Sequence, residues 1–109
     1  MNAHGQTSPF LLAAERLEEW ASEIPEWHSG SNELWYEFLD RRYEAELDLA
    51  ARLRRLPTSD LWMCPTRTVI DLALGGIRIR SDQGLAGACR TWAREVRSRY
   101  GAQQVSAAV

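Results

Sequence analysis

The chain has 109 residues, a mass of 12.4 kDa and a net charge of −2, which is the size of one small domain with a modest core. All 13 basic residues are arginines, which excludes chemistry that needs a lysine, such as Schiff-base formation or a Walker-type phosphate loop. No apolar run reaches the ~18 residues of a membrane span, and the N-terminus lacks the basic and apolar regions of a signal peptide. We therefore expect a cytoplasmic protein with reduced cysteines and no contact with a membrane.

The first helix is predicted to follow a loose tail over residues 1–7. Ser8 suits the cap position, Pro9 suits the first helical position, and Pro25 ends the run. Apolar side chains recur at three- and four-residue steps between these limits, so one face of this helix is expected to be buried.

The longest helix is predicted over Asn32–Leu56, with Pro57 ending it. Its broad apolar side predicts that it is the spine of the domain, with the first and last helices packed against it. Arg42 and Glu46 interrupt that side four residues apart. They either pair with each other or mark a level at which the helix bends or lies open. The apolar side comprises Trp35, Phe38, Leu39, Leu49, Ala50, Leu53 and Leu56.

A row of carboxylates follows another face of the same helix at steps of three and four residues. Its members are Glu33, Glu37, Asp40, Glu44 and Asp48. At a rise of about 1.5 Å per residue the row is about 22 Å long, and its mean spacing of about 5.6 Å is close to the repeat of a nucleic-acid backbone. Such a row is either a solvated face or a phosphate mimic that occupies an arginine-lined groove of a partner.

Residues 66–80, TRTVIDLALGGIRIR, fit two different structures. Pro65 at a first helical position and Gly75 after the last turn favour a short buried helix followed by an extended linker. The alternative is a β-hairpin in which Gly75 and Gly76 form a tight turn between two strands. Of the two, we expect the helix.

The last helix is predicted from Asp82, its cap, to Tyr100, with Gly101 at the stop position. The residues of its apolar face, which we expect in the core, are Leu85, Cys89, Trp92, Val96 and Tyr100. A basic set lies on the opposite face and just before the helix, and comprises Arg78, Arg80, Arg90, Arg94 and Arg97. Because arginine binds phosphate and carboxylate alike, this set predicts contact with nucleic acid, with protein or with water.

Charge is unevenly distributed between the two halves of the chain. Residues 1–64 hold 12 of the 15 acidic side chains, whereas residues 65–109 hold 7 of the 13 arginines. The two halves are expected to pair within one molecule or between copies, so a homo-oligomer is one expectation.

Trp27 and Trp62 lie in predicted connectors, where a tryptophan either covers the core or anchors a partner. Both are candidate interface residues.

Catalysis and metal binding have little support in the sequence. The two cysteines and two histidines lack the spacing of zinc ligands, and no nucleophile motif or phosphate-binding glycine loop occurs. We therefore predict no catalytic residue, no metal and no cofactor. A helix starting at Pro65 would lower the pKa of Cys64, but no partner base is evident for it.

Together these elements predict a mainly α fold, a compact bundle of three to four helices over residues 8–101, followed by a flexible tail at 102–109. A short β-hairpin around Gly75-Gly76 is the variant. For function we expect a non-enzymatic protein-binding module, an inhibitor or regulator that occupies a partner's nucleic-acid-binding surface with its acidic helix face. Small phage and mobile-element inhibitors have this size and charge. The alternative is a nucleic-acid-binding subunit of a larger assembly that uses the C-terminal arginines.

Overall fold

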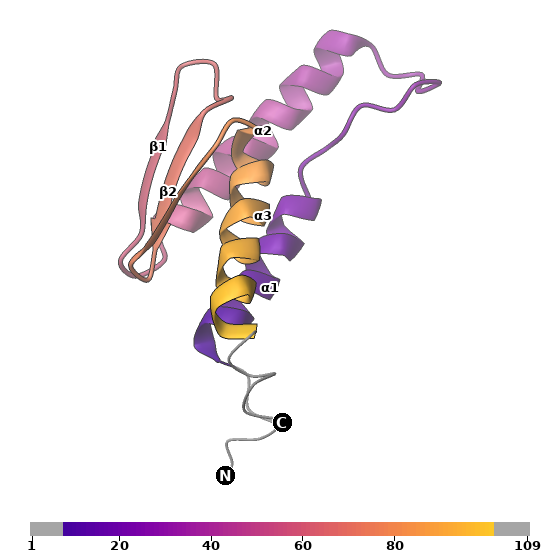
Figure 1. Cartoon of the computed structure of the whole chain (residues 1–109). Helices are drawn as coiled ribbons and strands as arrows, with labels where there is room; N and C mark the ends of the chain where they lie inside the picture. The colour runs from indigo at the N-terminus through magenta and orange to yellow at the C-terminus, as the bar shows by residue number, and fades with distance from the viewer. Residues whose placement is uncertain (1–7, 102–109) are drawn as a thin grey trace.

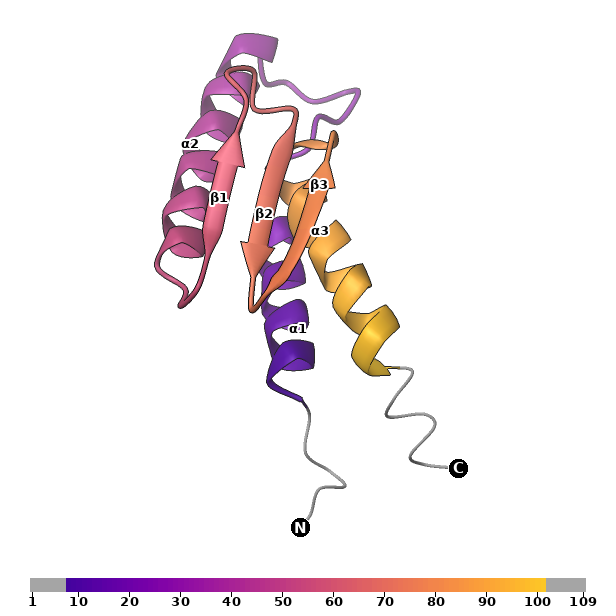
Figure 2. The same cartoon turned by 60° about the vertical axis from the view of Figure 1, so that its left-hand side comes forward.

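The protein, described by a computed structural model over residues 8–101, combines three α-helices with a three-stranded antiparallel sheet. In chain order its elements are α1 (Pro9–Ser22), α2 (Trp35–Arg54), β1 (Asp60–Met63), β2 (Ile70–Leu74), β3 (Ile77–Ser81), α3 (Gly84–Val96) and a π-helical turn at Arg97–Gly101. The helices lie against one face of the sheet and leave the other face open (Figures 1 and 2). The predicted mainly α bundle is therefore wrong, and the fold is α+β. The predicted tails lie outside the described residues.

A β-hairpin occupies the segment in which we expected a helix. Side chains of β2 and β3 alternate between buried and less buried positions, which places Ile70, Leu72 and Leu74 in the core. Gly75 and Gly76 both have positive φ, +59° and +82°, as a two-residue hairpin turn requires. A helix would have spread the same three apolar side chains around its axis, so the hairpin buries them better.

Helix α1 begins where its sequence predicts. The Ser8 hydroxyl accepts a hydrogen bond from the Phe10 N–H at 3.2 Å, and Pro9 is the first helical residue. Its buried side chains include Ala14 and Ala21, whose small size allows a close approach to α3, the element that α1 contacts most. The prediction for the start of α3 is wrong, because α3 begins at Gly84 and Asp82 does not cap it.

The predicted role of α2 as the spine of the domain is also wrong. Since α1 packs on α3, only the C-terminal half of α2 reaches the core, through Leu49, Ala50 and Leu53. The N-terminal half extends beyond the other helices (Figures 1 and 2). Trp35 and Leu39, both predicted to be core residues, are exposed.

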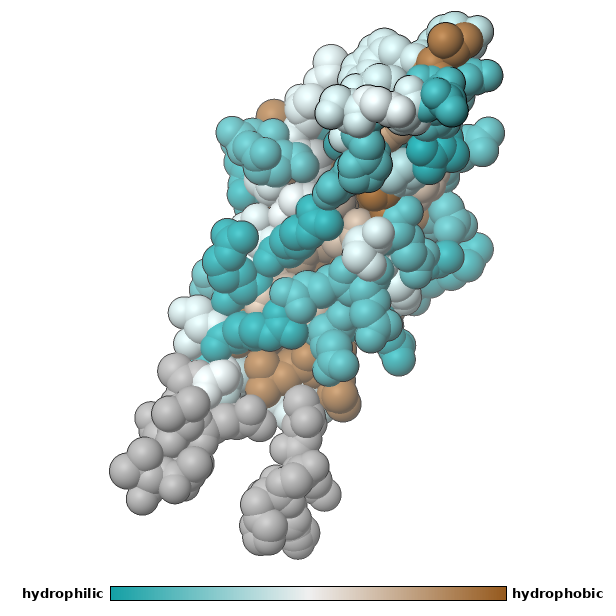
Figure 3. Space-filling model, turned by 90° about the vertical axis from the view of Figure 1, so that its right-hand side faces the viewer, coloured by the Kyte–Doolittle hydropathy of each residue, from teal (hydrophilic) through white to brown (hydrophobic). Residues whose placement is uncertain are grey.

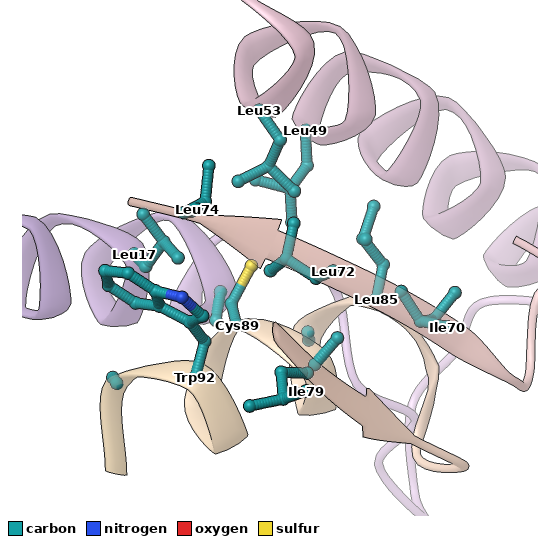
Figure 4. Close-up of a cluster of buried hydrophobic side chains, with 14 of the residues drawn as sticks. Leu17, Leu49, Leu53, Ile70, Leu72, Leu74, Ile79, Leu85, Cys89 and Trp92 are labelled. Atoms are coloured by element: carbon teal, nitrogen blue, oxygen red, sulfur yellow. The ribbon is translucent and has the colours of Figure 1, made fainter. Parts of the chain in front are cut away.

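The core lies between the inner face of the sheet and the three helices (Figure 4). Leu49 and Leu53 reach it from α2, and Cys89 and Trp92 reach it from α3, as their spacing predicted. At the far end of the molecule, the rings of Phe10 and Tyr100 stack with centroids 4.6 Å apart. Within residues 8–101, no helix has both the length and the apolar composition that crossing a membrane requires.

Candidate functional site

The N-terminal half of α2 carries a continuous row of exposed apolar side chains. We call it the apolar stripe, and its members are Trp35, Tyr36, Leu39, Tyr43 and Leu47. Each is between 41% and 63% exposed. Single exposed apolar residues are common on protein surfaces, whereas a contiguous row on one helix face is typical of an interaction site. The sequence pattern placed two of these residues, Trp35 and Leu39, on the apolar side that was expected to be buried.

Trp27 extends the apolar stripe from the loop that precedes α2. Its ring packs edge-on against Trp35, with centroids 5.0 Å apart, and against Phe38 at 5.3 Å. Phe38 is buried beneath this cluster, while Trp27 itself stays 41% exposed. One side of the Trp27 ring therefore covers Phe38, and the remainder is exposed, so contact of Trp27 with a partner stays a prediction.

The predicted acidic row lies on α2 and the residues just before it, but its ends are neutralised. Glu33 pairs with Arg41 at 2.8 Å, and the hydrogen bond from Arg41 lowers the pKa of Glu33. Asp48 pairs with Arg52 at 3.0 Å. The centre of the row, Glu37, Asp40 and Glu44, is exposed and forms no ion pair within the part of the chain that the structure describes. Glu37 also accepts the backbone N–H of Leu34 at 3.1 Å, which caps the helix.

The five arginines of the basic set are divided between two surfaces. Arg78 and Arg80 lie on the open face of the sheet, paired with Asp60 at 2.8 Å and with Asp71 at 3.4 Å. Arg90 of α3 lies 3.9 Å from Glu26, and Arg97, the first residue of the π-helical turn, pairs with Glu18. Only Arg94 has no carboxylate within 4.0 Å among residues 8–101. Most of the basic set is therefore paired inside one molecule.

The surfaces around these ion pairs are largely polar. Figure 3 shows that the face carrying the loop between α1 and α2 is mostly hydrophilic, with apolar colour confined to small separate areas.

Trp62, expected in a connector, lies instead in β1 on the open face of the sheet and is 50% exposed. Its strand neighbour is Asp71, which pairs in turn with Arg80 in register. The open face thus carries two Asp–Arg ion pairs beside the exposed ring of Trp62.

A groove of about 400 Å³ separates α2 from the β1–β2 loop and the start of α3. We call it the arginine groove, after Arg42 and Arg67 in its lining. Both arginines meet Glu46, whose side chain is only 7% exposed. Glu46 Oε1 lies 3.2 Å from Arg67 Nε, and its Oε2 lies 3.6 Å from Arg42 Nε. The sequence left open whether Arg42 pairs with Glu46 or marks a level at which the helix bends or lies open. The structure forms the pair, and the neighbouring Leu39, Tyr43 and Leu47 are exposed.

Sequence reasoning missed Arg67 altogether, because its place in the groove depends on tertiary structure. The residue has φ of +60°, in the left-handed region, inside a turn closed by its N–H donating to the Cys64 carbonyl at 2.8 Å. Its guanidinium lies over the ring of Tyr43, 4.2 Å from the centroid. Arg67 thereby joins the β1–β2 loop to α2.

Cys64 lies at the start of the same loop and accepts several hydrogen bonds. The Thr66 hydroxyl, the Val69 N–H and the Thr68 hydroxyl together lower the pKa of Cys64 to about 6. The cause is this ring of donors, and the helix start that the sequence suggested does not exist. Burial raises the pKa of the Cys89 thiol to about 12. Among the described residues, no group of three or more His, Cys, Asp or Glu is placed to hold a metal.

Comparison with known proteins returned no match: no family model, no curated protein and no solved structure is similar to this chain.

Proposed function

We propose that this protein is a non-catalytic binding module that docks on a partner protein through the exposed face of α2. The observation that carries this proposal is the apolar stripe, whose five side chains stay between 41% and 63% exposed although Trp27 and Arg67 contact two of them. Burying a large apolar side chain contributes about 1.5–3 kcal/mol when it starts fully exposed. The five half-exposed side chains of the stripe would therefore contribute several kcal/mol to binding before ordering costs.

The charges beside the apolar stripe define the chemistry of the partner. Glu37, Asp40 and Glu44 form an exposed negative edge along it. A complementary partner presents an apolar groove with arginines or lysines on the facing rim, since charge complementarity directs encounter and orientation. Nucleic-acid-binding proteins carry basic surfaces of this kind. Docking there would exclude nucleic acid from the partner, which is the inhibitory or regulatory activity that we propose.

The alternative function, direct nucleic-acid binding by the basic set, has weaker support. Arg78, Arg80, Arg90 and Arg97 are all engaged with carboxylates of the same chain. A phosphate would have to displace those carboxylates on two separate surfaces.

We also propose a cytoplasmic location, because both cysteines are free thiols and the cytoplasm keeps thiols reduced.

Capture of partners from extracts of the source cells tests the docking proposal. The bait is the full chain, compared with two double variants of α2, Tyr36→Ser/Leu47→Ser and Asp40→Arg/Glu44→Arg. The matched control is Leu12→Ser/Glu15→Arg on α1, where one apolar and one acidic side chain are similarly exposed. We expect the wild type and the control to retain the partner, and each α2 variant to lose at least about tenfold in affinity.

The identity and nuclease sensitivity of the captured material complete the test. The proposal expects a protein with a basic surface, and expects competition between this chain and nucleic acid for that protein. Capture that is unchanged in both α2 variants would overturn the proposal. Capture that nuclease abolishes would favour the nucleic-acid alternative, and capture of the chain by itself would favour a homo-oligomer.

A further inference from the structure

We infer that the arginine groove binds a carboxylate of the docked partner through Arg42 and Arg67. This inference rests on the proposed function, because it takes the partner to lie along the apolar stripe. The arginines would contact a negative group of the partner, whereas the acidic edge formed by Glu37, Asp40 and Glu44 would contact positive groups. The contact would fix the direction in which the partner lies on α2.

The groove and the apolar stripe are continuous. Leu39 and Tyr43 belong to the stripe and also line the groove. Successive residues of a helix are about 100° apart around its axis, so Arg42 and Glu44 flank Tyr43 on opposite sides. A partner covering Tyr43 therefore meets a carboxylate on one flank and a guanidinium on the other.

Glu46 holds both guanidinium groups at the groove without using all of their donors. Its carboxylate oxygens lie nearest to the Nε atoms of the two arginines, at 3.2 Å for Arg67 and at 3.6 Å for Arg42. The terminal nitrogens of both arginines have no other carboxylate within 4.0 Å among the described residues. The side chains of Arg67 and Arg42 remain 34% and 40% exposed, so part of each side chain is accessible to a ligand. Two guanidinium forks on one groove, of which Arg67 is hydrogen-bonded to Glu46, match the two oxygens of a carboxylate.

The backbone conformation of Arg67 does not favour an arginine at this position. The contacts of its side chain therefore explain why an arginine is found there. A non-glycine residue in the left-handed region costs about 1–2 kcal/mol, and glycine or asparagine would fit the turn with less strain. The strain is offset by the ion pair with Glu46 and by the stacking on Tyr43. Strain that surrounding contacts hold in place is typical of binding sites.

The lining of the groove matches a carboxylate rather than a phosphate. It contains Asp82 as well as Glu46, so the two arginines are balanced by two carboxylates. A groove without net formal charge gains little from a second negative charge on the ligand, and the planar pair of carboxylate oxygens fits a guanidinium fork. The start of α3, at Gln83 and Gly84, contributes the positive end of a helix dipole on the same side. An Asp or Glu side chain, or a C-terminal carboxylate, fits these conditions.

Titration of the isolated full-length protein with sodium acetate tests the groove directly. The readout is the NMR signals of the arginine Nε–H groups, at constant ionic strength, with inorganic phosphate in a parallel arm. We expect saturable shifts at Arg42 and Arg67 with acetate, and weaker binding of phosphate. Arg67→Lys, which keeps the charge but loses the fork, should reduce acetate affinity about tenfold. Arg42→Lys is a second variant with the same expectation, and Arg94→Lys is the control that should bind as the wild type does.

Three results of the titration would overturn the inference. They are the absence of saturation, equal shifts at Arg94, and tighter binding of phosphate than of acetate. Thermal unfolding of each variant, followed by circular dichroism, verifies that the comparison is made on folded protein.

Partner capture then separates this inference from the proposed function. If Tyr36→Ser/Leu47→Ser loses the partner while Arg67→Lys captures it as the wild type does, docking stands and the carboxylate contact is overturned. If acetate binds but capture is insensitive to Tyr36→Ser/Leu47→Ser, the docking proposal fails, and with it the assignment of the carboxylate to the partner. Support for both the docking proposal and the carboxylate contact requires that Tyr36→Ser/Leu47→Ser and Arg67→Lys each weaken capture of the partner.

Discussion

The indole Nε1 of Trp92 donates a hydrogen bond to the carbonyl oxygen of Ile77 across 3.1 Å, in the buried interior. This bond joins α3 to the first residue of β3. Trp92→Phe removes the donor, leaves that carbonyl oxygen without it and opens a small cavity. We expect a loss of about 2–4 kcal/mol in the free energy of unfolding, measured by urea denaturation with circular dichroism. Trp62→Phe, on the open face of the sheet, is the control and should change stability by less than about 0.5 kcal/mol. Equal losses in the two variants would contradict this account.

Glu46 is expected to be the most sensitive acidic residue of α2. Glu46→Ala leaves Arg42 and Arg67 without their shared carboxylate in a partly buried position. Breaking a fully buried pair costs about 3–5 kcal/mol, and the partial exposure of both arginines reduces the expected loss to about 2 kcal/mol. Glu44→Ala, on the exposed side of the same helix, should stay within about 0.5 kcal/mol of the wild type. Chemical denaturation of the three proteins under one set of conditions provides the comparison.

The two glycines of the hairpin turn should respond differently to the same substitution. Gly76→Ala meets open space and introduces only the strain of positive φ, about 1–2 kcal/mol. Gly75→Ala adds a steric conflict, because its Cβ would lie 2.6 Å from Cε1 of Phe10. We expect Gly75→Ala to lower the thermal midpoint further than Gly76→Ala. The reverse order would mean that Phe10 moves aside without cost.

Cys64 should react with iodoacetamide far below the pH that an ordinary thiol requires. The hydrogen bonds from Thr66, Val69 and Thr68 lower the pKa of Cys64 to about 6, so the alkylation rate should rise through pH 6 and level off by pH 8. Replacing Thr66 with Val removes the donor with the largest effect and should move this rise to higher pH. Cys89, whose pKa burial raises to about 12, should react only after unfolding. A rise centred near pH 9 in the wild type would contradict the prediction.

The same thiolate links stability to pH with a definite sign. Because the pKa of Cys64 is lower in the folded state than in the unfolded state, where it is near 9, folding releases protons between these values. The contribution of the Cys64 thiolate to the free energy of unfolding is therefore fully present above pH 9 and is lost as pH falls through 6. The difference in stability between the wild type and Cys64→Ser should accordingly grow in favour of the wild type from pH 6 to pH 9. A difference that is flat over that range would show that the hydrogen bonds do not favour the thiolate.

Features set by residues close in sequence could be predicted. The start of α1 depends on Ser8 and Pro9 alone, and the buried face of α3 depends on the steps between Leu85, Cys89 and Trp92. The acidic row was predictable for the same reason, since helical periodicity places Glu37, Asp40, Glu44 and Asp48 on one side of α2, with Glu33 just before the helix. Local patterns of this kind are independent of which element packs against which.

The hairpin and the exposed half of α2 depend on contacts distant in sequence. Pro65 and Gly75 resemble the limits of a helix, and the strand assignment needs the pairing of β2 with both β1 and β3. Likewise, the apolar stripe looks like core until α1 is known to pack on α3. Arg67 and Glu46 are 21 residues apart, and their contact depends on the packing of α2 beside β1 and on the turn in which Arg67 is left-handed.

The stacked rings of Phe10 and Tyr100 also have a practical consequence for how this protein is handled. They hold the beginning of α1 beside the end of the π-helical turn, at the end of the molecule opposite the N-terminal half of α2 (Figure 1). A fluorophore, a solid support or a second protein joined directly at residue 8 or at residue 101 would attach at that end. The exposed face of α2 would then point outward from a sensor surface, whichever of the two positions carries the attachment.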